Sequence, residues 1–304
     1  MPIGTLLHLN DADRSLIVRA SLLVAPVILI AAAVAGCSTK DNGPTAPGRP
    51  STSSESSATT HAHVSAGDVR GLVIAAVQRT KKSKFSVRTS YLVRSGATPL
   101  TAEGVVDFSN STSTLQLALP LGSGFRVTEI LSPTSIFIGG PNGIPPLDIG
   151  GPVDLPPGKW AEVPRATQHT HDPLRGRAND SADNLTQLSQ ADDLSDIGED
   201  SIDGVVCRHV RGYLSRATLT QFIDPSVLYS WQRIIDDLGS KAYVAEAWIN
   251  PDGTIRRLKE GYESIAGSSN IVIDLTSPSN LDIPSPPAAD SVVKSKSFSD
   301  ALLG

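Results

Sequence analysis

The fold is predicted first from residues 243–276, which read YVAEAWINPDGTIRRLKEGYESIAGSSNIVIDLT. Tyr243–Ile249 and Ile271–Thr276 are rich in β-branched and aromatic residues, which is typical of strands. Ile255–Ser264, between them, is predicted to be the middle strand. Between the first and the middle strand stands Asn250-Pro251-Asp252-Gly253, a set of residues that favours a tight turn. These residues therefore predict an antiparallel three-stranded meander.

A hairpin is predicted upstream of this meander. Asp196–Ile202 and Val205–Leu214 are predicted to be its two strands. Asp203-Gly204 lies between them and is a strong hairpin signal. The hairpin and the meander together predict five strands that pair mostly with their neighbours in sequence.

Two helical segments are predicted in the same half of the chain. Leu219–Leu238 has apolar residues at helical spacing, with a break near Pro225. Asp172–Asp193 is predicted to be a second helical segment, with Leu185 and Leu188 as its apolar contacts.

The N-terminal half begins with a predicted helix over Gly67–Lys82, whose apolar residues recur every three or four positions and whose end is basic. Beyond it the period changes to two, which predicts antiparallel strands. A loop rich in Gly and Pro, Gly139–Gly158, interrupts the series. The predicted strand segments are Phe85–Val93, Val105–Asp107, Leu115–Leu119, Phe125–Leu131, Ser135–Ile138 and Lys159–Val163.

One helix, many antiparallel strands and inserted helices together predict an α+β fold. We expect a large curved antiparallel sheet, an incomplete barrel, covered on its concave side by helices. Loose covering would leave an apolar cavity and tight covering would leave a filled core, and the sequence leaves both open. The folded domain is predicted to span residues 67–281. Residues 282–304, rich in Pro, Ser and Lys, are predicted to be a disordered tail.

Residues 1–36 are identified as a signal peptide. Arg14 and Arg19 precede an uncharged apolar run, Ala20–Gly36, which is shorter than the about 20 residues that a membrane-spanning helix prefers. The run ends in Val34-Ala35-Gly36-Cys37, which resembles the lipobox of bacterial lipoproteins. The resemblance implies that a signal peptidase recognises Val34, Ala35 and Gly36, and that Cys37 carries the lipid.

Lipidation of Cys37 implies a protein anchored to the cell membrane by acyl chains of the palmitate kind, on the extracytoplasmic face. Two or more acyl chains anchor a protein firmly, whereas one binds reversibly. Residues 37–66 consist mainly of Ser, Thr, Pro, Gly and Ala, a composition typical of a disordered tether. Its root-mean-square reach would be on the order of 30 Å.

Several classes of function are disfavoured by composition and motifs. The 304 residues carry a formal net charge of −5, and without a basic stripe we expect no binding of nucleic acid. Once Cys37 is lipidated, Cys207 has no cysteine left for an intramolecular disulfide. The sequence lacks a Gly-x-Ser-x-Gly elbow, a phosphate-binding loop and a His-Glu-x-x-His motif. We therefore expect neither an enzyme nor a cofactor or metal site.

Two longer stretches resemble the LppX/LprG-type bacterial lipoproteins. They are Leu185–Val210, LTQLSQADDLSDIGEDSIDGVVCRHV, and Ala245–Leu258, AEAWINPDGTIRRL. Gly158-Lys159-Trp160 and Lys84–Val87 resemble two short strands of the same family. The resemblance implies a fold like that of the LolA and LolB carriers, an incomplete barrel with helices at its mouth. It also implies the handling of acylated lipids.

Two functions follow as hypotheses. The first is a membrane-anchored lipoprotein that binds, and in its stronger form transfers, an acylated lipid or lipoglycan in the cell envelope. The second is an interaction or regulatory lipoprotein with a closed core and an envelope protein as partner. An apolar pocket of about several hundred Å³ would favour the first and a filled core the second. The residues predicted to line a lipid are Leu115, Leu117, Leu119, Val127, Ile136, Ile138, Leu185, Leu188, Val206, Val210 and Trp231.

Overall fold

Strands account for most of the structure, a computed structural model that describes residues 66–93, 96–118, 126–140, 155–239, 241–264, 267–277, 281–283 and 285–294. The described residues belong to one compact unit, Thr60–Gly304. The predicted signal peptide, Cys37, most of the tether and Leu119 lie outside them. Among the described residues, no helix is long and apolar enough to cross a membrane.

The strands form one sheet in the order β12-β6-β5-β4-β3-β2-β1-β11-β10-β9-β8-β7. Every neighbouring pair is antiparallel except β12 and β6, and the sheet ends at β12 and β7 without closing. The strands are β1 (Lys84–Leu92), β2 (Leu100–Asp107), β3 (Thr112–Ala118), β4 (Arg126–Leu131), β5 (Ser135–Gly139), β6 (Trp160–Pro164), β7 (Asp192–Ile202), β8 (Val205–Tyr213), β9 (Tyr243–Ile249), β10 (Ile255–Ser264), β11 (Gly267–Thr276) and β12 (Val292–Lys294).

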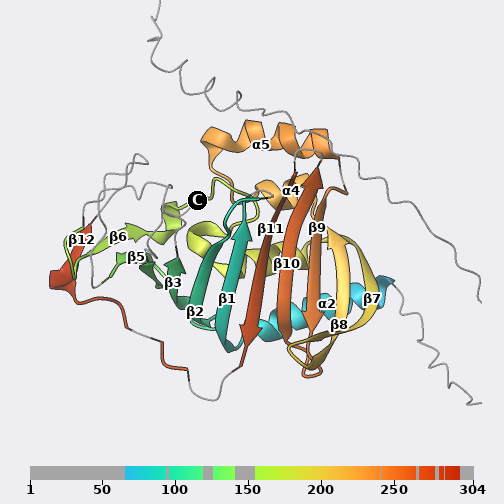
Figure 1. Ribbon diagram of the computed structural model, residues 1–304, viewed down its shortest axis with the longest axis horizontal. Coiled ribbons are helices and arrows are strands. Elements are labelled where there is room, and N and C mark those ends of the chain that lie inside the picture. Colours follow the sequence, from blue (N-terminus) through green and yellow to red (C-terminus); the bar gives the residue numbers. More distant parts are fainter. Residues whose placement is uncertain are drawn as a thin grey trace, which may run out of the picture. The chain divides into compact units, whose positions relative to one another are not determined.

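The helices lie on one face of the sheet and beyond one end of its strands (Figure 1). Helix α2 packs on β7, β10 and α3, and α3 packs on β9 and β10. Helices α4 and α5 contact each other. The helices are α2 (Ala66–Thr80), α3 (Ser181–Ser189), α4 (Arg216–Thr220) and α5 (Pro225–Leu238), with short 3-10 turns η1 (Arg165–Thr167), η2 (Arg177–Asn179) and η3 (Ala289–Ser291).

The two faces of the sheet differ because side chains alternate along each strand. The inner face, under α2 and α3, carries the main hydrophobic cluster, with residues such as Phe85, Leu117, Tyr243 and Ile273. The outer face carries ion pairs such as Arg257 with Asp274. The predicted α+β class and the large open sheet are therefore confirmed.

One of the two predicted helical segments requires correction. Asp172–Asp193 is not one helix, since only Ser181–Ser189 is α-helical and β7 begins at Asp192. The reason is local, because Ala178 and Asn179 adopt left-handed backbone conformations and Asp180 caps α3 by accepting from the Ala182 N–H.

The other prediction, a helical segment over Leu219–Leu238 with a break near Pro225, is confirmed, since α4 ends at Thr220 and α5 begins at Pro225. Asp224 caps α5 by accepting from the Ser226 N–H, and Pro225 occupies the first turn, where its missing N–H costs nothing.

The tail is corrected as well. The prediction of a disordered tail over residues 282–304 is wrong for Ala289–Lys294, which form η3 and then β12. Pairing with the edge of β6 supplies backbone hydrogen bonds that a solvated tail would lack.

Candidate functional site

The inner face of the sheet is covered near its centre by residues 165–191, which contain η1, η2 and α3 and which we call the cover. Apolar anchors hold it, since Leu174, Leu185 and Leu188 are at most 1% exposed. Between these anchors the contact with the sheet is polar. That polar layer, together with a small cavity in it, is the candidate site.

Asn184 on α3 and Glu260 on β10 form the first polar contact. The Asn184 Nδ2 atom donates to Glu260 Oε2 at 2.7 Å and to the Leu174 carbonyl at 3.0 Å. Glu260 is fully buried, and this burial raises its pKa to about 8. Its other oxygen, Oε1, has no hydrogen-bond partner among the described residues. The carboxyl is therefore protonated near neutral pH and incompletely satisfied.

Asn179 and Glu129 repeat this arrangement on another strand. Asn179 Nδ2 donates to Glu129 Oε2 at 3.0 Å, and Arg175 donates to the Asn179 side-chain oxygen. Glu129, on β4, is fully buried, and burial raises its pKa to about 8. Its Oε1 atom also lacks a partner in the described part of the chain.

A third contact joins β1 to the start of the cover. The Tyr91 hydroxyl donates to Asp172, and the Arg175 guanidinium lies 5.5 Å from the centre of the Tyr91 ring. Burial raises the pKa of Asp172 and lowers that of Arg175. The three contacts place an arginine and three carboxyl groups inside a layer that also contains aliphatic side chains.

A cavity of about 10 Å³ lies within this layer. This volume suits about one water molecule, far below the about 300–1,000 Å³ of ligand pockets. Both asparagines of the Asn–Glu pairs line it. The lining residues are Thr89, Tyr91, Leu100, Ala102, Ile271 and Ile273 from the sheet, and Arg175, Gly176, Asn179, Ser181 and Asn184 from the cover.

The residues predicted to line a lipid lie mostly in close-packed core. Leu115, Leu117, Leu185, Leu188 and Val210 belong to the main hydrophobic cluster. Val127, Ile136 and Ile138 belong to a second cluster nearer β6. The interior of the described residues is therefore filled in this structure.

Val206 and Trp231 lie apart from these clusters. Val206 is 54% exposed and does not face the interior. Trp231, on α5, is half-buried and donates from Nε1 to the His171 carbonyl at 2.6 Å. It thus links α5 to the cover.

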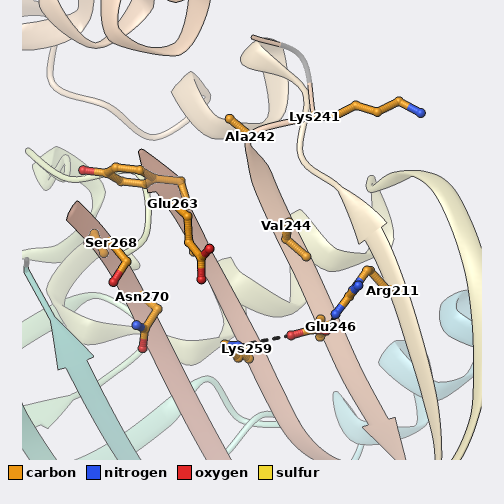
Figure 2. A pocket seen from close by; sticks show the side chains of 12 residues that line it. Arg211, Lys241, Ala242, Val244, Glu246, Lys259, Glu263, Ser268 and Asn270 are labelled. Carbon is orange, nitrogen blue, oxygen red and sulfur yellow. Dashed lines mark hydrogen bonds and ion pairs between the residues drawn. The ribbon is translucent and has the colours of Figure 1, made fainter. Parts of the chain in front are cut away.

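Larger hollows lie elsewhere on the surface. A groove of about 380 Å³ opens on the outer face of β9, β10 and β11 (Figure 2). In it Glu246, only 5% exposed, accepts from Arg211 Nε at 2.9 Å and pairs with Lys259 Nζ at 3.3 Å. A second hollow, of about 650 Å³, is bordered by α4, α5 and the start of β7. Its rim carries exposed ion pairs, including Arg216 with Asp236.

Comparisons with known proteins were made for the whole chain. It is similar to LprF from Mycobacterium bovis, with 14% identity and a TM-score of 0.44 over 75% of this chain and 100% of that one. It is also similar to the lipoprotein LppX from Mycobacterium tuberculosis, with 16% identity and a TM-score of 0.41 over 72% and 100%. A LolA superfamily protein from Nitrosomonas europaea has 11% identity and a TM-score of 0.30 over 71% and 94%.

No family model and no curated protein matches the chain. LppX, whose family the two sequence stretches resemble, is among the solved structures to which this chain is similar.

Sequence reasoning missed the buried polar layer. Glu260 stands between Leu258 and Tyr262 at a spacing of two, so period-two alternation could have placed it on the inner face. The partner Asn184 is 76 residues away in sequence, and nothing local identifies it.

Proposed function

We propose that this protein is a membrane-anchored lipoprotein that binds an acylated lipid between the inner face of its sheet and the cover, without covalent chemistry. The lipobox-like Val34-Ala35-Gly36-Cys37 supports the anchor. Transfer of the lipid between membranes is the stronger form of the same proposal. In this account the structure is the closed form, and the cover must move to admit a ligand.

The observation that carries the proposal is the pair of buried, incompletely satisfied carboxyls, Glu129 and Glu260, beneath the cover. A buried polar group without its full set of partners costs about 1–3 kcal/mol. This cost is relieved when the cover lifts and water or ligand reaches the carboxyl. The interface with the cover is therefore the part of the core that is expected to open most easily.

The driving force for lipid binding would be burial of acyl methylenes, each worth about 0.8 kcal/mol. The inner face offers aliphatic side chains for this purpose, Ile271 and Ile273 beside the cavity and Leu117 deeper in the core. A ligand of this kind needs no reacting group in the protein. We therefore propose a binding protein and not an enzyme.

A second candidate is an envelope interaction lipoprotein with a permanently closed core. Close packing under the cover favours it, because the two small cavities that cover residues line measure about 10 and 20 Å³. In that case the cover would stay in place with any lipid present, and a protein partner would bind an outer surface.

Hydrogen–deuterium exchange tests the first proposal against the second. The purified chain is incubated with and without a lipid extract of bacterial envelope, and exchange is followed by peptide. Lipid binding predicts altered exchange in α3 and in residues 174–179, with no change in the β7–β8 hairpin, the internal control. Identical exchange in the cover with and without lipid would contradict lipid binding there and leave the interaction module.

A further inference from the structure

The edge of the sheet at β6 is occupied by the chain's own C-terminal segment (Figure 1). Val292 pairs with Trp160, Val293 with Ala161 and Lys294 with Glu162, in the parallel direction. Just before the strand, Lys159 Nζ donates to the Asp290 carbonyl at 2.9 Å. A turn and three strand residues thus hold the segment on β6.

The pairing of β12 with β6 is short and buries little surface. Strand β12 has three residues and β6 has five, so part of the β6 edge is not paired by β12. Val293 is 49% exposed, Lys294 is exposed and Val292 is half-buried, so little apolar area is buried by the contact. Parallel pairing is also slightly less stable per residue than antiparallel pairing.

The register indicates what this edge selects. Lys294 stands opposite Glu162, whose Oε1 accepts from Ser135 Oγ at 2.8 Å and which is only half-buried. The two valines stand opposite Trp160 and Ala161. Apolar, apolar and basic residues in an extended segment therefore match this edge in shape and in charge. In strand addition the main chain supplies affinity and the alternating side chains supply specificity.

We propose that the β6 edge is a strand-addition site for an extended segment of another protein with the pattern apolar-apolar-basic, and that Val292–Lys294 holds this site in cis. The inference does not rest on lipid binding, because the pairing of β12 with β6 uses neither the Asn179–Glu129 nor the Asn184–Glu260 contact. The tail protects the edge from unselective pairing. A partner segment must compete with an intramolecular strand whose effective concentration is on the order of millimolar.

The test compares the full chain with a variant that lacks residues 289–304. The probe is a fluorescent peptide with the sequence of residues 288–297, AADSVVKSKS, and its anisotropy is followed on titration. The truncated chain is expected to bind the peptide at least about tenfold more tightly than the full chain, since the competing strand is gone. Circular dichroism and urea unfolding establish that the truncated chain is folded. If truncation unfolds it, the full-length Val293→Pro variant replaces it. Ala161 bonds toward β5, so in the parallel register its partner Val293 is the β12 residue whose N–H faces β6, and proline there removes this ladder donor.

Two control peptides complete the design. A peptide with Val293→Pro should not bind, and a peptide with Lys294→Glu should bind several-fold more weakly because it repels Glu162. Equal affinity of the full and opened chains, no binding by a folded opened chain, or binding of the proline peptide would overturn the proposal. Dimerisation of the opened chain without peptide would also overturn it, since the occupant would then be a second copy.

Discussion

Asn184 reaches from α3 to Glu260 on β10 with its side-chain amide at 2.7 Å, and both residues are at most 1% exposed. The contact joins residues that are 76 positions apart and is the only hydrogen bond that the Glu260 carboxyl makes among the described residues. The buried Glu260 carboxyl therefore keeps its hydrogen bond only while the cover lies on the sheet.

We expect Asn184→Ala to lower the free energy of unfolding by about 1–3 kcal/mol, because Glu260 and the Leu174 carbonyl lose their shared donor in a dry environment. Gln190→Ala, at the exposed C-terminal end of the same helix, is the matched control and should change stability by less than about 0.5 kcal/mol. Urea denaturation measures both. Equal losses of unfolding free energy in the two variants would show that the Asn184–Glu260 hydrogen bond does not stabilise the fold more than an exposed residue does.

The strands of the meander could be predicted because apolar residues in period two leave a signal in sequence that does not depend on distant partners. Tyr243–Ile249 and Ile255–Ser264 have the predicted bounds, while the third strand begins earlier, at Gly267. Pairing with β10 extends it through Gly267-Ser268-Ser269-Asn270, residues of low strand propensity. Tertiary pairing overrides local preference here.

The candidate site could not be predicted in the same way. Asn179 and Asn184 are polar residues in a segment rich in turns, and their burial depends on strands far away in sequence. The three-residue β12 is also too short for any periodic signal, and it exists because the β6 edge is available. Contacts of long sequence separation decide both features.

The stability of the fold should depend on pH through Glu260. Burial raises its pKa to about 8 from an ordinary value of 4.5, so between these values the folded chain holds a proton that the unfolded chain has released. The stability that proton binding to Glu260 gives the folded chain is therefore fully present below pH 4.5 and is lost as the pH rises toward 8.

Glu260→Gln replaces the titrating carboxyl with an amide of similar size that can still form hydrogen bonds but does not titrate. Across that window wild type should lose stability relative to the variant by at most about 1.4 kcal/mol per pH unit. Urea unfolding of both chains at a series of pH values measures the difference. Glu103→Gln, which changes an exposed carboxyl paired with Arg88, is the control. Parallel curves for wild type and Glu260→Gln would contradict the buried proton.

Core packing distinguishes two of the residues predicted to line a lipid. Leu188 is fully buried in the main cluster, so Leu188→Ala should cost about 2–5 kcal/mol through lost burial and a cavity. Val206 is 54% exposed, and Val206→Ser should cost less than about 0.5 kcal/mol. Thermal and urea unfolding compare the two. A large loss for Val206→Ser would place that side chain in an interior that the structure does not give it.

Membrane attachment should depend on one of the two cysteines. We expect Cys37→Ala to move the protein from the membrane fraction to the soluble or unprocessed fraction, because without the thiol no diacyl anchor forms. Cys207→Ala is the matched control, since that thiol is buried on β8 and should leave fractionation unchanged. Cell fractionation and intact mass measure the outcome. Retention of a processed, fully membrane-bound Cys37→Ala chain would rule out the lipobox.

The most direct test of lipid binding is native mass spectrometry, with lipid extraction, of the chain purified from a bacterial host. Binding under the cover predicts a co-purifying acylated lipid at near-stoichiometric occupancy, with altered occupancy in Asn184→Ala because the closed form is weakened. A clean mass without ligand, unchanged after incubation with an envelope lipid extract, would contradict the lipid-binding account and favour the interaction lipoprotein.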